Sequence, residues 1–120
     1  MAFSWFRAMK GLIVREPWIS LILTGQKTME MRKTRTKNIG RIALLNRGYI
    51  WGYATLYRCE GPLSKEELLQ RAGEHCIASE RITSPDFQYK FGWMLNQVEK
   101  LPNPEKYNHP RGAQSWVNLS

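Results

Sequence analysis

The 120-residue sequence contains few cysteines and no long apolar run. Its two cysteines, Cys59 and Cys76, are too few for a disulfide framework, and we expect reduced thiols in a cytoplasmic protein. No apolar run approaches the about 20 residues needed to span a bilayer. Residues 1–11 also lack the apolar core of a secretory signal. The sequence therefore favours a cytoplasmic protein over a secreted or membrane-spanning one.

Several motifs of catalysis and cofactor binding are also missing. The sequence has no glycine-rich phosphate loop and no nucleophile-elbow motif. The histidines and cysteines, His75, His109, Cys59 and Cys76, do not have the spacing of a metal site. We therefore expect neither a metal nor another cofactor.

Acidic residues are scarce in the first half of the chain. The formal net charge of +8 divides into +9 for residues 1–59 and −1 for residues 60–120. The densest cationic stretch, residues 27–47, also contains regularly placed apolar residues, so it is more typical of folded chain than of a disordered basic arm. Such an excess says nothing about the fold, but it favours an anionic partner.

The hydropathy pattern predicts one small domain over residues 1–120 with short strands and a few helices. A helix follows Pro17 and ends at Gly25, a second begins at the Ser64–Glu67 capping box, and a third short helix includes Cys76 and Ile77. Residues 101–112 are rich in proline, asparagine and glycine and are expected to form a loop. The predicted strands are 10–15, 27–33, 41–46, 50–58, 87–98 and 114–119.

Most of these strands lie too close together along the chain for parallel crossover connections. We therefore expect an α+β fold, in which a mixed, mostly antiparallel sheet of five or six strands curls into a small β-barrel with two to three peripheral helices.

The clearest candidate site is the segment from Gly25 to Arg32. Strict alternation over residues 27–33 places Glu30 and Arg32 on one strand face, where they can pair or reach a common ligand. Lys27 stands at the helix–strand junction, where other cations could lower its pKa and make it a base or nucleophile. Arg32 could bind a phosphate or carboxylate. The alternative is a solvated, charged strand.

A second candidate is the loop Tyr107–Gly112, which contains His109 and Arg111. These side chains and Asn108 are suited to a base and a phosphate, although the same residues are ordinary in loops. Among the aromatic residues, those inside predicted strands are expected to pack in the core. Trp18 lies beside Arg15 at a helix start, where it could stack on a base or anchor the core.

The Pro17-Trp18 helix and the following Gly25-x-Lys27-x-x-Glu30-x-Arg32 strand resemble the ASCH domain family of the PUA-like superfamily. The resemblance extends from the GLIVREPW strand to the terminal YNHPRGAQSWVNL segment. It implies a small β-barrel with peripheral helices and a cleft that holds nucleic acid or a nucleoside.

By that resemblance, Lys27, Glu30 and Arg32 line the cleft, with Arg15 and Trp18 nearby and His109 and Arg111 at its rim. Basic residues from Lys33 and Arg35 to Arg47 then form a docking surface for a phosphate backbone.

Some members of the family are enzymes. One branch removes the acetyl group of N4-acetylcytidine with a lysine, a threonine and a glutamate. Lys27 matches that lysine, and Glu30 stands at the threonine position. Strand alternation puts nearby Thr28 on the face opposite to Lys27, and the glutamate falls near Glu74 or His75. Another branch is reported as ribonuclease.

Three hypotheses follow. The first is binding of RNA, other single-stranded nucleic acid or a modified nucleoside through a basic cleft. The second is a hydrolase in which Lys27 is the base or nucleophile and Glu30 orients it or shuttles the proton. The third is an interaction module for an acidic protein surface. The oligomeric state is left open.

Overall fold

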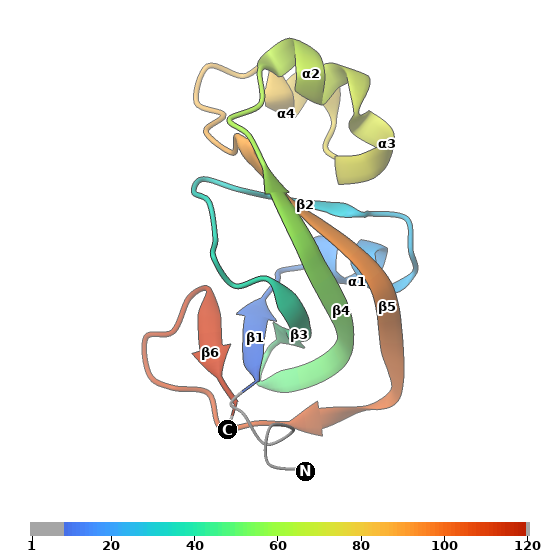
Figure 1. Ribbon diagram of the computed structural model, residues 1–120, viewed down its shortest axis with the longest axis vertical. Coiled ribbons are helices and arrows are strands. Elements are labelled where there is room, and N and C mark those ends of the chain that lie inside the picture. The colour runs from blue at the N-terminus through green and yellow to red at the C-terminus, as the bar shows by residue number, and fades with distance from the viewer. Residues whose placement is uncertain (1–8, 120) are drawn as a thin grey trace.

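The structure is a computed structural model that describes residues 9–119, and within them it has six strands and four short helices (Figure 1). None of these helices is both long and apolar enough to cross a membrane. The elements in chain order are β1 (Lys10–Ile13), α1 (Trp18–Leu23), β2 (Met29–Arg32), β3 (Gly40–Asn46), β4 (Tyr49–Glu60), α2 (Lys65–Gln70), α3 (Ala72–His75), α4 (Ser79–Ile82), β5 (Phe91–Lys106) and β6 (Trp116–Asn118).

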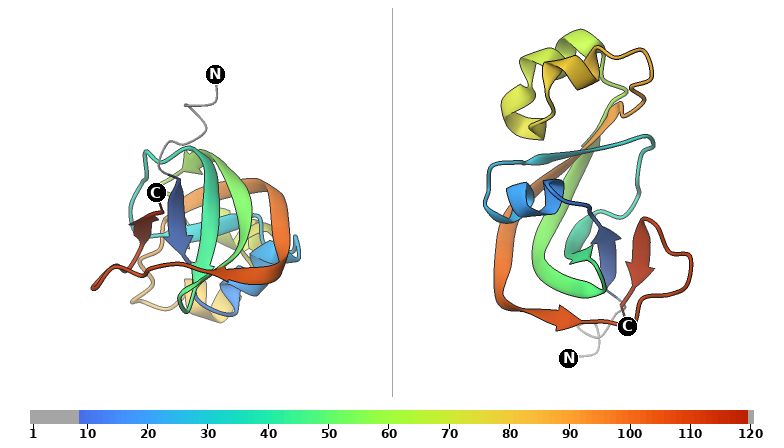
Figure 2. Two further views of the ribbon diagram at one scale, coloured as in Figure 1. Left: turned by 90° about the horizontal axis from the view of Figure 1, so that it is seen from below. Right: turned by 180° about the vertical axis from the view of Figure 1, so that it is seen from behind.

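The six strands form one sheet in the order β2-β5-β4-β3-β1-β6. Only the β1–β3 pair is parallel, and the other neighbours are antiparallel. Seen from below, the strands curve around a shared interior in a half-barrel (Figure 2). The predicted α+β class and the curled, mostly antiparallel sheet are thereby confirmed.

The main core lies inside this curve and is completed by α1. Ile19 and Ile22 are buried on one face of the helix, at the three-residue spacing that puts side chains on the same side. They pack against apolar side chains of β1, β3, β4 and β5, among them Leu12, Leu44, Leu56 and Leu95. The helix therefore covers one opening of the curled sheet and fixes where the chain enters β2.

Helices α2 to α4 form a cap at the end of the sheet where β4 ends and β5 begins (Figure 1). The predicted capping box starts α2, since the Ser64 hydroxyl accepts from the Glu67 amide and the Glu67 carboxylate accepts from the Ser64 amide. A second core holds the cap on the sheet, and it contains Met29, Met31, Leu63, Leu68, Ile82, Phe87 and Met94.

The prediction for β5 was wrong at both ends. Residues 87–90 are not strand: Phe87 belongs to the second core, and Tyr89 packs edge-to-face against it. Residues 101–106, predicted as loop, continue β5, and Glu105 and Lys106 pair with Ile50 and Tyr49 at the start of β4. Proline usually excludes a central strand, but Pro102 and Pro104 lie in the register shift between the Gly52–Lys100 and Ile50–Glu105 pairs, where no residue of β5 is paired with β4.

The expected short helix around Cys76 and Ile77 was also misplaced. Helix α3 ends at His75, and Cys76 has a left-handed backbone with φ of 63°. Both residues therefore connect α3 to α4 rather than continuing a helix.

Candidate functional site

The turn between α1 and β2 brings Lys27 into the interior. Gly25 has φ of 84°, a conformation that favours glycine, and it reverses the chain after α1. The amides of Gln26 and Lys27 both donate to the Leu21 carbonyl at 3.0 Å, which closes the turn. Lys27 precedes the first residue of β2, so it is not bound by the strand alternation, and its side chain lies on the same side as that of Glu30.

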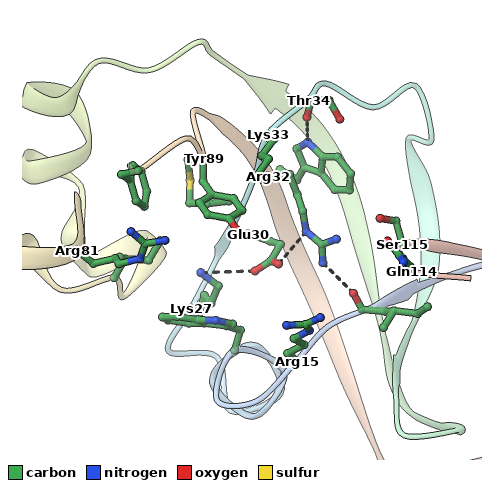
Figure 3. Close-up of a pocket in the computed structure, with 16 residues that line it drawn as sticks. Arg15, Lys27, Glu30, Arg32, Lys33, Thr34, Arg81, Tyr89, Gln114 and Ser115 are labelled. Carbon is green, nitrogen blue, oxygen red and sulfur yellow. Dashed lines mark hydrogen bonds and ion pairs between the residues drawn. The ribbon is translucent and has the colours of Figure 1, made fainter. Parts of the chain in front are cut away.

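Lys27, Glu30 and Arg32 form a buried ion-pair cluster (Figure 3). The Lys27 Nζ lies 3.6 Å from Glu30 Oε1, and Arg32 Nε donates to Glu30 Oε2 at 3.0 Å. Lys27 is 1% exposed and Glu30 is 6% exposed. One carboxylate therefore lies between two cations in a site that is largely shielded from water.

The surroundings of Lys27 hold its amine in one place. Its Nζ donates to the His75 carbonyl at 2.6 Å and lies 4.7 Å from the centre of the Trp18 ring. Burial lowers the pKa of Lys27 from its ordinary value of 10.5, because the charged form loses its hydration, while the Glu30 carboxylate opposes that shift. The Lys27 amine therefore loses its proton more readily than a lysine amine on the surface does.

Arg32 bridges the open side of the half-barrel. Its Nη2 donates to the Ile13 carbonyl at 2.9 Å, which ties edge strand β2 to the end of β1. The guanidinium also lies 5.4 Å from the centre of the Trp93 ring, whose Nε1 donates to the Thr34 carbonyl at 2.9 Å. Arg32 therefore has both a structural role and a position at the mouth of the site.

These side chains open onto a cavity of about 630 Å³, called the first cavity below. It lies between the turn after α1, strand β2, the cap and the segment before β6. In Figure 3, Arg81 approaches it from α4, and Arg15 approaches it from the segment after β1. It is lined by Ile13, Arg15, Trp18, Lys27, Glu30, Met31, Arg32, Lys33, Thr34, Ile77, Arg81, Phe87, Tyr89, Trp93, Gln114 and Ser115.

A second cavity of about 420 Å³ adjoins the first. Ile13, Arg15 and Gln114 line both. The remaining lining residues of the second cavity are Arg47, Gly48, Tyr107, His109 and Ala113.

The structure thus brings together most of the candidate residues taken from the sequence. Arg35 and Arg111 line neither cavity, and Arg35 instead donates to the Gly61 carbonyl and lies 5.1 Å from the centre of the Phe91 ring. His109 lines the second cavity and not the first. The candidates that line the first cavity are Arg15, Trp18, Lys27, Glu30, Arg32 and Lys33.

Among the lining residues of the first cavity that the sequence did not single out are Arg81, Tyr89 and Gln114. Arg81 comes from α4, Tyr89 from the segment before β5, and Gln114 from the segment before β6. No local pattern marks them, because their positions depend on how the cap and the last strand fold back over β2. The centre of the Tyr89 ring lies 5.4 Å from the Lys33 Nζ, so a cation and an aromatic ring are in contact there.

The threonine and glutamate considered for amide hydrolysis lie elsewhere. Thr28 lines neither cavity, and its backbone amide donates to the Glu74 carbonyl at 2.9 Å. The Glu74 carboxylate is paired with Arg71 at 2.8 Å. Among residues 9–119, no group of histidine, cysteine or acidic side chains is arranged to hold a metal ion.

A curled, mostly antiparallel six-stranded sheet with short helices at its ends is a PUA-like fold. The ASCH domain family matches residues 12–110, so the chain belongs to that family, which is generally linked to RNA binding.

Solved structures that share the fold include two of an ASCH protein. An ASCH protein from Zymomonas mobilis superposes with a TM-score of 0.75 at 15% identity, over 93% of this chain and 87% of that one. A point mutant of the same protein gives 0.74 at 16% identity, over 95% and 91%. At such identities the likeness shows the fold alone. No curated protein matches the sequence significantly.

Proposed function

We propose that the protein binds single-stranded RNA or a modified nucleotide, with one base in the first cavity. The observation that carries this proposal is the buried Lys27–Glu30–Arg32 cluster at that cavity. Burying ions costs free energy, and a buried ion pair is often replaceable by apolar side chains without loss of stability. The cluster is therefore poorly explained by stability alone, and it places hydrogen-bonding groups in the wall of the first cavity.

The cluster has the donors and acceptors that the edge of a base requires. The Lys27 Nζ and Arg32 Nη1 are donors for carbonyl oxygens and ring nitrogens, and Nη1 makes no hydrogen bond within residues 9–119. Glu30 can accept from an exocyclic amine. Trp18 and Tyr89 provide aromatic faces at the same cavity, on which an unpaired base can stack.

The cationic first half of the chain accounts for attraction of the phosphate backbone. Lys33 and Arg15 are exposed at the first cavity, and neither side chain forms an ion pair within the described residues. Unpaired cations beside the pocket bind phosphates without reading sequence, and the affinity they supply falls as salt rises.

The test is fluorescence anisotropy with a labelled, unstructured oligoribonucleotide over a salt series. Lys27→Met removes the donor while keeping an apolar stem against Trp18, and we expect it to weaken binding by at least about tenfold. Lys100→Met removes the same charge from an exposed position in β5 that lines neither cavity, and should change binding by less than about threefold. No binding at low salt, or equal losses in both folded variants, contradicts the proposal.

One observation favours hydrolysis as a second function. The burial that lowers the pKa of Lys27 makes its amine a candidate base, and Glu30 lies 3.6 Å away to orient it. In that role Lys27 takes a proton from the water that attacks the amide carbon, Glu30 keeps the ammonium in place, and Lys27 returns the proton to the departing N4 amine as the C–N bond breaks. The measurement is acetate release from N4-acetylcytidine and cleavage of RNA. Absence of both products with folded protein removes this alternative and leaves the binding proposal standing.

A further inference from the structure

The second cavity contains cations that no part of the described chain neutralises. The guanidinium groups of Arg15 and Arg47 make no hydrogen bond or ion pair within residues 9–119. The other arginines of that range, except Arg111, each donate to an oxygen of the chain; they are Arg32, Arg35, Arg41, Arg58, Arg71 and Arg81. None of the residues lining the second cavity is acidic.

A single unpaired arginine on a surface is ordinary, but two at one concave site without a carboxylate raise the local positive potential. His109 adds a third group. Its Nδ1 lies 2.8 Å from the Tyr107 hydroxyl. When that hydroxyl donates to Nδ1, the ring proton is on Nε2, which is then a further donor.

The backbone holds these three side chains at one place. Asn46 Nδ2 donates to the Val14 carbonyl at 2.8 Å, which fixes the chain directly before Arg15 beside the chain directly before Arg47. The Tyr107 amide donates to the Gly48 carbonyl at 3.1 Å, which fixes the segment of His109 against the same turn. The cavity is therefore assembled from three distant parts of the sequence.

The conformation of Arg47 provides an independent indication. Arg47 and Gly48 form the two-residue turn between β3 and β4, and their φ angles are 53° and 82°. Two positive φ angles define the turn type in which asparagine, not arginine, is favoured at the first position. An arginine in this unfavourable backbone conformation is not explained by the turn, and binding of a ligand by its side chain explains it better.

From these observations we infer that Arg15, Arg47 and His109 form a phosphate subsite. It binds the phosphodiester next to the nucleotide whose base occupies the first cavity, since Arg15 and Gln114 line both cavities. Guanidinium groups suit the tetrahedral oxygens of a phosphate. This inference rests on the proposed function and extends it, because the ligand is then an oligonucleotide of two or more nucleotides rather than a free nucleoside.

The key variant is Arg47→Asn, which removes the charge and places the favoured residue in the turn. Oligoribonucleotide binding should weaken by about tenfold, and the slope of log affinity against log salt should become shallower by about 0.7, the value for one phosphate contact on a single strand. The melting temperature should be equal to or above that of the unaltered protein, which separates binding from folding. Arg111→Asn is the matched control, because Arg111 is also exposed and makes no ion pair within residues 9–119, but it lines neither cavity.

Three small probes identify the source of the phosphate: a nucleoside, its 5′-monophosphate and a dinucleoside monophosphate. We expect the dinucleoside monophosphate to bind more tightly than the nucleoside, and Arg47→Asn to remove that gain while leaving nucleoside binding unchanged. A gain confined to the 5′-monophosphate overturns the phosphodiester assignment.

Equal losses in Arg47→Asn and Arg111→Asn, or no loss in Arg47→Asn, overturn the subsite. If oligonucleotide binding then still depends on Lys27, the proposed function stands without it. If the unaltered protein binds none of these ligands at low salt, the proposed function and the subsite fail together.

Discussion

The ion-pair cluster makes a quantitative prediction for Glu30→Gln. This substitution keeps the size and shape of the side chain and removes the one carboxylate that lies between Lys27 and Arg32. The glutamine oxygen can still accept one hydrogen bond. What is lost is the charge that balances two cations at a position only 6% exposed.

Removing one partner of a buried ion pair typically costs about 3–5 kcal/mol, because the remaining charge is left without compensation. A domain of this size loses roughly 3–5 °C in melting temperature per kcal/mol. We therefore expect Glu30→Gln to melt roughly 10–25 °C lower at pH 7. Loss of the carboxylate also lowers the pKa of Lys27 in the folded protein further below 10.5, its ordinary value. Between these two pKa values the unfolded chain binds more protons than the folded one, so the stability of the variant rises with pH. The deficit should therefore shrink as the pH rises toward 10.

The assay is thermal unfolding followed by circular dichroism at pH 7 and at higher pH. Glu99→Gln is the matched control, because Glu99 pairs with Arg41 at 3.2 Å but its side chain is 63% exposed. An exposed pair contributes about 0–1 kcal/mol, so this variant should melt within a few degrees of the unaltered protein. Equal melting temperatures for both variants would refute the account of Glu30 as a buried counter-ion.

Two further predictions concern pH and the bridge across the half-barrel. His75 is buried and neutral, with Nδ1 accepting from the Ile77 amide at 2.9 Å, and burial lowers its pKa from the ordinary 6.5. Its contribution to stability is complete above pH 6.5 and is lost as pH falls below it, because the unfolded chain takes up the proton first. Urea titrations should therefore show that His75→Gln loses less unfolding free energy at acid pH than the unaltered protein does. Arg32→Lys leaves one Nζ for both Glu30 and the Ile13 carbonyl, so it should cost about 1.5–3 kcal/mol in the same titration, and an unchanged midpoint would contradict the bridging role.

The face on which Glu30 and Arg32 lie was predictable from sequence, because strand alternation is a local property. Their contact at 3.0 Å confirms the alternation. The position of Lys27 on the same side was suggested only by its place at a helix end, and it required the glycine turn to bring it there. The local chemistry of the site was therefore accessible from one short segment.

The remainder of the site depends on contacts between distant parts of the chain. Arg47 and His109 line the same cavity only because the β3–β4 turn lies against the segment after β5. Arg81 reaches the first cavity only because the second core holds α4 over β2. The extension of β5 through Pro102 and Pro104 was missed for the same reason, since these prolines are tolerated in a register shift that depends on the pairing with β4.

The most direct test of the account is an NMR titration with an unstructured oligoribonucleotide, observing the tryptophan indole N–H signals. Trp18 lines the first cavity, whereas Trp51 lines neither cavity and donates to the Asn46 carbonyl at 2.9 Å. The two signals can be assigned with Trp18→Phe and Trp51→Phe. If a base enters the first cavity, the Trp18 signal shifts and saturates while the Trp51 signal keeps its position. A Trp18 signal that stays fixed while RNA binds would contradict the account.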